Sequence, residues 1–175
     1  MGYGNQTAVN EQTSLFNCAE RPSKPKSASV PVYKVTLVRE GRVSCYQQQI
    51  RSSADASTLL HTYLADVDRE YFVTILLNQK NRVLCVNTIS VGSLTASIVH
   101  PREVYKSAIL SNAASIICGH NHPSTDCQPS KEDRAITARL VEAGKLLGIA
   151  ILDHVIISGT GKYFSFADEG LLERC

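Results

Sequence analysis

Residues 114–123 read Ala114-Ser115-Ile116-Ile117-Cys118-Gly119-His120-Asn121-His122-Pro123, and the fold is best predicted from this stretch. Its apolar first half predicts a buried strand, and Pro123 ends strand pairing. Side chains at positions i and i+2 of an extended chain point to the same side, so His120 and His122 face one way and Asn121 faces the other. We therefore expect two imidazoles to be presented together at the end of a core strand.

A carboxylate follows the two histidines after a polar loop rich in turn-forming residues. This residue, Asp133, lies eleven positions after His122. Two neutral imidazoles and one carboxylate form a typical ligand set of a catalytic zinc site, in which the fourth position is left for water. The spacing therefore predicts a zinc site made of His120, His122 and Asp133.

The same residues also have an explanation without a metal. A pair of histidines near a strand end is often only part of a polar loop, and the run Ser130-Lys131-Glu132-Asp133 fits a helix N-terminus with a capping box. The two explanations are compatible, because a carboxylate in the first turn can face the strand end while Ser130 begins the helix.

The continuous pattern His-x-His-x7-Ser-x2-Asp resembles a known family. Together with His100-Pro101-Arg102-Glu103-Val104-Tyr105, Pro129-Ser130 and Leu152-Asp153-His154, it is similar to the JAB/MPN (JAMM) metalloprotease domain, in the bacterial branch called RadC. The resemblance runs from about Val30 to Lys162. One departure is Thr125, where this branch usually has glycine, and a change in a short loop should not disturb the ligands.

The resemblance implies a fold, a cofactor and roles for further residues. The implied fold is a three-layer α/β JAB/MPN (deaminase-like) domain with a mixed central sheet, and the implied cofactor is one Zn²⁺ per chain. Glu70 matches the family's general base at the start of the strand after the first helix, although a solvated loop residue is the simpler explanation. Glu103 competes for this role, but the helix dipole explains a carboxylate in a first helical turn. Ser130 resembles the family's serine that stabilises the oxyanion, or it is only a helix cap.

The order of predicted elements agrees with such a fold. We expect a hairpin within residues 30–49, followed by a helix from Ser52, strands at 71–77 and 82–91, a helix from Pro101, the histidine-bearing strand, a helix at 130–147, a strand at 149–157 and a short strand at 163–166. The second helix should carry Val104, Tyr105, Ala108 and Ile109 on one face, and the third should direct Ile136, Leu140, Val141 and Leu147 inward.

Composition indicates one globular domain with an arm. The chain has 175 residues, of which 43% are hydrophobic and 19% charged, which suits a single core. Residues 1–29 are polar with few apolar anchors, so we expect a disordered N-terminal arm followed by a metallohydrolase domain at 30–175.

The net charge and the cysteine spacing limit the expected binding partners and the expected cellular compartment. A net charge of +2 without a basic stripe argues against strong nucleic-acid binding. The sequence has no apolar run of membrane-spanning length and no signal region, and its six cysteines have no compact framework, so we expect the cytoplasm. Cys127 is expected to be a loop cysteine, and Asp153-His154 either orients a ligand or is a hydrogen-bonded pair at a strand end.

Three function classes remain at this point. The first is a zinc metallohydrolase that cleaves a peptide or isopeptide bond of an unidentified protein or peptide. The second is an accessory factor of DNA repair or recombination, because the RadC branch carries that label. We expect a short form without the helix-hairpin-helix segment of longer members, which weakens this reading. The third is a metal-stabilised interaction module without turnover.

Overall fold

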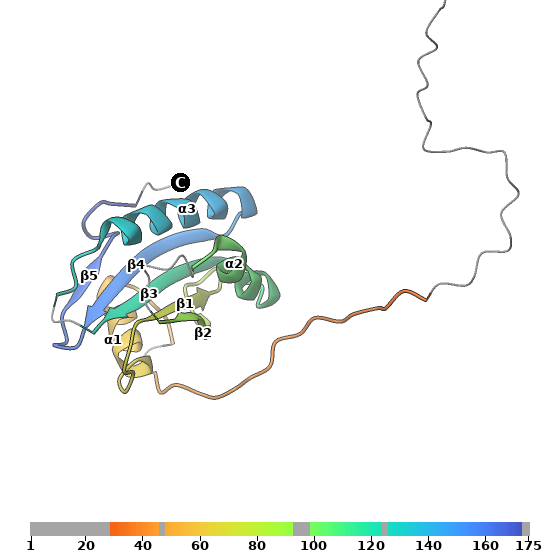
Figure 1. Ribbon diagram of the computed structural model, residues 1–175, viewed down its shortest axis with the longest axis horizontal. Helices are drawn as coiled ribbons and strands as arrows, with labels where there is room; N and C mark the ends of the chain where they lie inside the picture. Colours follow the sequence, from red (N-terminus) through yellow and green to blue (C-terminus); the bar gives the residue numbers. More distant parts are fainter. Residues whose placement is uncertain (1–28, 46–47, 93–98, 124–125, 173–175) are drawn as a thin grey trace, which may run out of the picture. The chain divides into compact units, whose positions relative to one another are not determined.

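The structure is a computed structural model that describes residues 29–45, 48–92, 99–123 and 126–172 (Figure 1). Contacts divide the chain into two units, Met1–Val35 and Thr36–Cys175. In the first unit, the described residues 29–35 are exposed and form no helix or strand. Most of the predicted arm lies outside the described residues, so the arm stays a prediction. Thr125 also lies outside them.

The second unit contains all the described helices and strands. In chain order they are α1 (Ser53–Tyr63), β1 (Tyr71–Leu77), β2 (Val83–Val91), α2 (Pro101–Leu110), β3 (Ser115–His122), α3 (Lys131–Leu147), β4 (Ala150–Ser158) and β5 (Tyr163–Ser165). This order confirms the prediction from Ser52 onward. In the part of the chain that the structure describes, no helix is long and apolar enough to cross a membrane.

The five strands form one mixed sheet in the order β2-β1-β3-β4-β5. β3 and β4 are parallel, which requires a crossover connection, and α3 supplies it. All other neighbours are antiparallel. The histidine-bearing β3 is therefore the central strand, and the predicted mixed sheet is confirmed.

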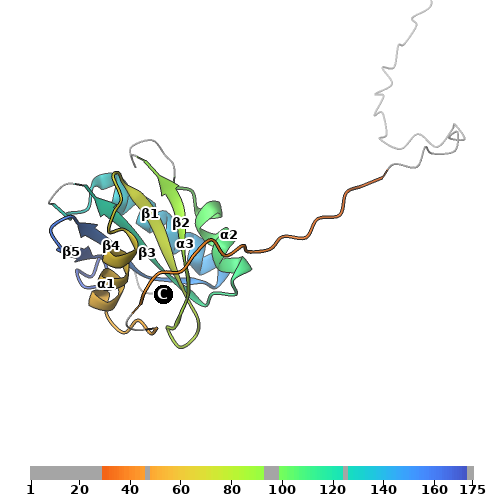
Figure 2. The same cartoon turned by 90° about the horizontal axis from the view of Figure 1, so that it is seen from below.

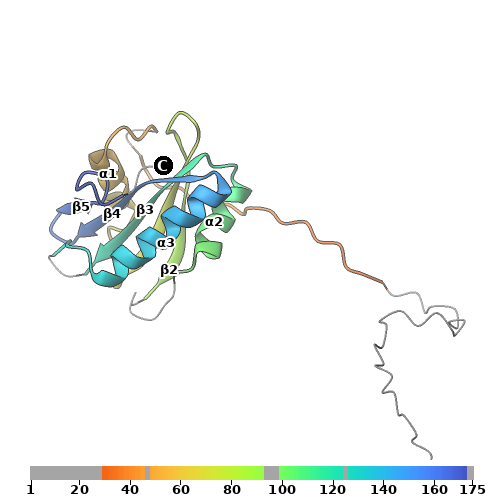
Figure 3. The same cartoon turned by 90° about the horizontal axis from the view of Figure 1, so that it is seen from above.

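Helices cover both faces of the sheet, which gives the expected three layers. Figure 2, from below, shows α1 in front of the sheet, and Figure 3, from above, shows α3 crossing in front of it. Side chains alternate between the two faces of each strand, so the sheet separates two hydrophobic cores. The core under α1 contains Leu59, Leu60, Val73, Ile75, Ile117 and Val155. The core under α2 and α3 contains Phe72, Leu76, Tyr105, Ile116, Cys118 and Leu140.

Local capping chemistry sets where the helices begin and end. Ser52 caps α1 and Ser130 caps α3, each in a reciprocal capping box with the aspartate three residues later. At the other end of α3, Gly148 adopts the left-handed conformation (φ 69°) that ends a helix. The first turn of α3 is therefore held by Asp133, one of the predicted zinc ligands.

Two predictions about packing are wrong. The expected hairpin is absent from residues 29–45, and most of its apolar side chains, among them Tyr33 and Val35, are exposed, whereas Val43 is half-buried against the core under α1. An alternating pattern forms a strand only when a packed surface receives its apolar side. Ile109 and Leu147 are also exposed, at 54% and 48%, because α2 and α3 turn these positions away from the sheet.

Gly144 allows a close contact between α3 and α2. A Cβ atom at this position would lie 2.5 Å from the Tyr105 hydroxyl oxygen and 2.6 Å from the Ile149 carbonyl oxygen. Gly144→Ala should lower the free energy of unfolding by about 1–3 kcal/mol through overpacking, offset in part by about 0.5–1 kcal/mol from the helix preference of alanine. Urea unfolding measures the change.

Tyr105→Phe provides the control for that prediction. It removes one of the two clashing oxygens, so Gly144→Ala should cost less in the Tyr105→Phe background than in the wild type. An alanine variant as stable as the wild type would show that the two helices do not approach each other so closely.

Candidate metal centre

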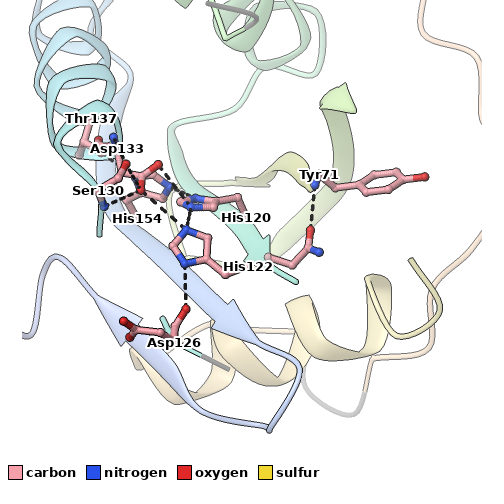
Figure 4. A network of polar contacts seen from close by, with 9 residues as sticks. Tyr71, His120, His122, Asp126, Ser130, Asp133, Thr137 and His154 are labelled. Carbon is pink, nitrogen blue, oxygen red and sulfur yellow. Dashed lines mark hydrogen bonds and ion pairs between the residues drawn. The ribbon is translucent and has the colours of Figure 1, made fainter. Parts of the chain in front are cut away.

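The C-terminal end of β3 and the first turn of α3 bring the three predicted ligands together (Figure 4). His120 and His122 lie on the face of the sheet that α3 covers, and Asp133 points at them from the helix. The two Nε2 atoms are 3.0 Å apart. Oδ1 of Asp133 lies 3.4 Å from Nε2 of His120, and Oδ2 lies 3.8 Å from Nε2 of His122. One ligand atom from each residue lies within 4.8 Å of the others.

The polar atoms that face one another here suit a cation. Asp126 offers its carbonyl oxygen to Nδ1 of His122 at 2.9 Å. A carbonyl only accepts, so this nitrogen carries the proton, and in the neutral ring Nε2 presents a lone pair to the group. Oδ1 of Asp133 is buried and has no hydrogen-bond partner among the described residues. A buried orphan oxygen is costly, and a metal ion between these donor atoms would satisfy it.

Metal binding requires neutral imidazoles and an ionised carboxylate, and the surroundings of His120 and Asp133 favour these states. Burial, reinforced by the neighbouring histidines, holds the pKa of His120 well below its ordinary value. Burial opposes ionisation of Asp133, but its contact with His122 and two hydrogen bonds from Ser130 hold the Asp133 pKa well below the usual range. The contact with Asp133 raises the pKa of His122, so this residue would release a proton when it binds a metal.

The group is closed on one side and open on the other. The side chains of His120 and Asp133 are 0% and 2% exposed, whereas that of His122 is 15% exposed. An opening beside one ligand leaves access for water or a substrate, as a catalytic zinc site requires. The donor set of two nitrogens and one carboxylate oxygen fits Zn²⁺.

The sequence of the second unit matches a family model described as RadC-like JAB domain over residues 50–171. The chain belongs to this family. A RadC-like JAB domain thus carries the three converging ligands.

Curated relatives agree with the assignment. The chain is 46% identical over 151 residues to a protein of Methanosarcina mazei and 54% identical over 123 residues to one of Rubrobacter xylanophilus, both named only UPF0758 protein. The matches cover 86% and 70% of this chain. They cover 66% and 53% of the relatives, so the chain spans about half to two thirds of their length.

In the RadC-like JAB domain, Glu70 lies two residues before Phe72, which pairs with His120 across β1 and β3. Glu70 immediately precedes β1, and its negative charge is among the causes that raise the pKa of His122. Asn121 holds the backbone on both sides of it: its Nδ2 donates to the Arg69 carbonyl and its Oδ1 accepts from the Tyr71 amide, each at 2.8 Å. The asparagine between the two histidines thus fixes the segment that carries Glu70.

The other two candidate residues also have defined surroundings. Ser130 caps α3, and its hydroxyl donates to Oδ2 of Asp133 at 2.6 Å. It therefore lies beside the ligands, and its role toward an oxyanion stays a prediction. Glu103 forms ion pairs with Arg102 and Lys106 on the surface of α2, which agrees with the structural role that the helix dipole suggested.

The prediction left Asp153-His154 open, and the structure separates the two. His154 points toward the metal centre and contacts His120, and burial lowers the pKa of His154 to about 4. Asp153 points the other way, where it accepts from the Ser165 hydroxyl and the Ala167 amide. Strand alternation shows that the two face opposite sides, but only knowledge that β4 lies next to β3 shows which one reaches His120.

Two further residues of the centre were missed. Thr137 lies one helical turn after Asp133 and contacts His154. Asn121 was placed on the opposite side of the strand from the histidines, without a partner. The spacing of four between Asp133 and Thr137 is a signal for Thr137, because such residues share a helix face. Cys127 packs against the cluster of Ile156, Phe164 and Phe166 and is not part of the ligand group.

Proposed function

We propose that this RadC-like JAB domain is a zinc-dependent hydrolase that cleaves a peptide or isopeptide bond with water. The observation that carries the proposal is the convergence of two imidazole nitrogens and an orphan carboxylate oxygen beside the partly exposed His122, with Glu70 just before β1, the strand that pairs with β3. A structural zinc site would be closed by a fourth protein ligand. Among the described residues the group has three.

Each residue has a role that follows from its place. Bound zinc would polarise the carbonyl of the scissile bond and lower the pKa of the attacking water. Glu70 takes the proton of that water and delivers it to the leaving amine. Ser130, whose hydroxyl donates to Oδ2 of Asp133 in the free site, would turn that hydroxyl toward the oxyanion, a contact worth about 3 kcal/mol of the barrier in other enzymes. The buried side chains of His120 and Asp133 exclude water from one side of the site, which strengthens these interactions.

Hydrolysis of amide conjugates tests the proposal. The zinc-loaded full chain is incubated with a panel of peptides and of isopeptides in which a lysine side chain carries the acyl group. We expect cleavage of at least one class, arrest by a chelator and recovery when zinc is restored. Asp133→Asn should abolish cleavage, because it removes the anionic ligand.

His61→Ala is the matched control for that test. His61 lies on α1, outside the ligand group, and its Nε2 has no hydrogen-bond partner among the described residues. Its replacement should leave cleavage unchanged. Cleavage that persists after complete removal of zinc, or in Asp133→Asn, would contradict the proposal.

A further inference from the structure

A buried chain of hydrogen bonds runs behind His120, on the side away from its ligand atom (Figure 4). Nδ1 of His120 lies 2.9 Å from Nε2 of His154. Nδ1 of His154 lies 2.6 Å from the hydroxyl oxygen of Thr137. That hydroxyl lies 2.5 Å from the main-chain carbonyl oxygen of Asp133. The chain therefore begins at one proposed ligand residue and ends at another.

The direction of every proton in this chain follows from its last contact. The Asp133 carbonyl can only accept, so the single hydroxyl proton of Thr137 is donated to it. Nδ1 of His154 must then carry a proton and donate to the Thr137 oxygen, which leaves a lone pair on Nε2 of His154. This lone pair accepts the proton of Nδ1 of His120. The reverse direction would leave the hydroxyl and carbonyl oxygens 2.5 Å apart without a proton between them.

We propose that His154 and Thr137 are positioning residues that hold His120 in the tautomer and ring orientation required for metal binding. With its proton on Nδ1, His120 presents the lone pair of Nε2 to His122 and Asp133. The inference rests on the proposed metal site. It adds that the site is completed by a neutral residue of β4 and a hydroxyl of α3, both outside the ligand set.

Aromatic packing holds the ring of His154 in place. Phe166 stacks on it with ring centroids 5.0 Å apart and an interplanar angle of 15°, and Phe72 meets it edge-on at 5.4 Å. His154 is fully buried and Thr137 nearly so, at 0% and 3% exposure. These contacts restrict rotation of the His154 ring, so the packing of the core sets the position of Nε2 of His154 relative to His120.

A neutral partner has a consequence for the charge of the centre. Ligating histidines commonly donate to a carboxylate, a main-chain carbonyl or water. Here the acceptor is an imidazole, which the direction of the chain leaves with one ring proton and therefore without charge. In the ligand group and the chain behind it, Asp133 is then the only anionic side chain, so a dication held there keeps a net positive charge. A positively charged centre polarises a carbonyl and acidifies water more strongly than a neutral one.

Two variants of Thr137 test the role of the hydroxyl. Thr137→Val has nearly the same shape but no hydroxyl, whereas Thr137→Ser keeps it. Zinc affinity of the full chain is measured by competition with a chelator. We expect Thr137→Val to weaken zinc binding by about 10–100-fold, the usual effect of losing such a partner, and Thr137→Ser to bind as the wild type does. A folded Thr137→Val variant with wild-type affinity would overturn the proposal.

The tautomer itself is measured on the metal-free wild type, so the proposal can be tested even when Thr137→Val does not fold. NMR of the chain with ¹⁵N-labelled histidine assigns the protonated ring nitrogen. We expect the proton of His120 on Nδ1 and that of His154 on Nδ1. A proton on Nε2 of either ring would reverse the chain and overturn the inference. Absence of zinc binding by the wild type would instead contradict the proposed function.

Discussion

Replacing Glu70 with glutamine should lower turnover by about 10²–10⁴-fold, the usual contribution of a general base, and leave zinc content and melting temperature near those of the wild type. Glutamine has the shape of glutamate but cannot accept the proton of water. Glu70 precedes β1 and its charge acts on His122. Asn121 holds the backbone on both sides of it, so the substitution should not move the segment. The rate on a cleaved conjugate, measured beside zinc content, gives the result.

Glu103→Gln is the matched control for this prediction. Glu103 is the carboxylate that competes with Glu70 for the role of general base, and its ion pairs with Arg102 and Lys106 lie on exposed α2. Lys106, followed by Arg102, holds the pKa of Glu103 below its usual value. Its loss should weaken only these surface contacts and leave turnover intact. If Glu103→Gln abolishes turnover and Glu70→Gln does not, the two roles must be exchanged.

The His120→Ala/His122→Ala double variant should contain no zinc, whereas the wild type should contain about one ion per chain, as a site with three ligands from one chain requires. Both replaced nitrogens point at the same position as the orphan oxygen of Asp133, and one carboxylate alone holds zinc weakly. Elemental analysis after dialysis measures the content. Equal zinc contents of the variant and the wild type would contradict the assignment of His120 and His122 as zinc ligands.

His61→Ala serves as the control again, because it removes one histidine without touching the ligand group. It should retain the zinc content of the wild type. His120 is fully buried, so its loss also leaves a cavity in the core. His122→Ala alone, at a partly exposed position, provides the same comparison when the double variant does not fold.

Much of the metal centre could be predicted from local sequence, because the strand period and the helix cap place its residues. The period of two in β3 puts His120 and His122 on one face. The capping box places Asp133 in the first turn of α3 next to Ser130. These two features depend on residues within a few positions of one another, and the structure shows both.

Packing of surface side chains and pairing of strands could not be predicted in this way. The alternation around Tyr33 and Val35 suggested a hairpin, but the described residues 29–45 form no strand. Ile109 and Leu147 fit an apolar stripe but are exposed. In each case the pattern describes a side chain that could be buried, whereas burial requires an element on the other side to cover it.

The sequence by itself determined which three residues could bind a metal, the direction in which two of them point and the family to which the chain belongs. The tertiary structure decided that the first turn of α3 lies beside the C-terminal end of β3, so that Asp133 meets both histidines, and that β4 runs parallel beside β3, so that His154 contacts His120. Strand order and helix placement result from burial of two cores across residues distant in sequence. Local periodicity carries no information about these contacts. The partners of His120, and the hydrogen bonds from Asn121 to the backbone on both sides of Glu70, are therefore known only from the assembled sheet.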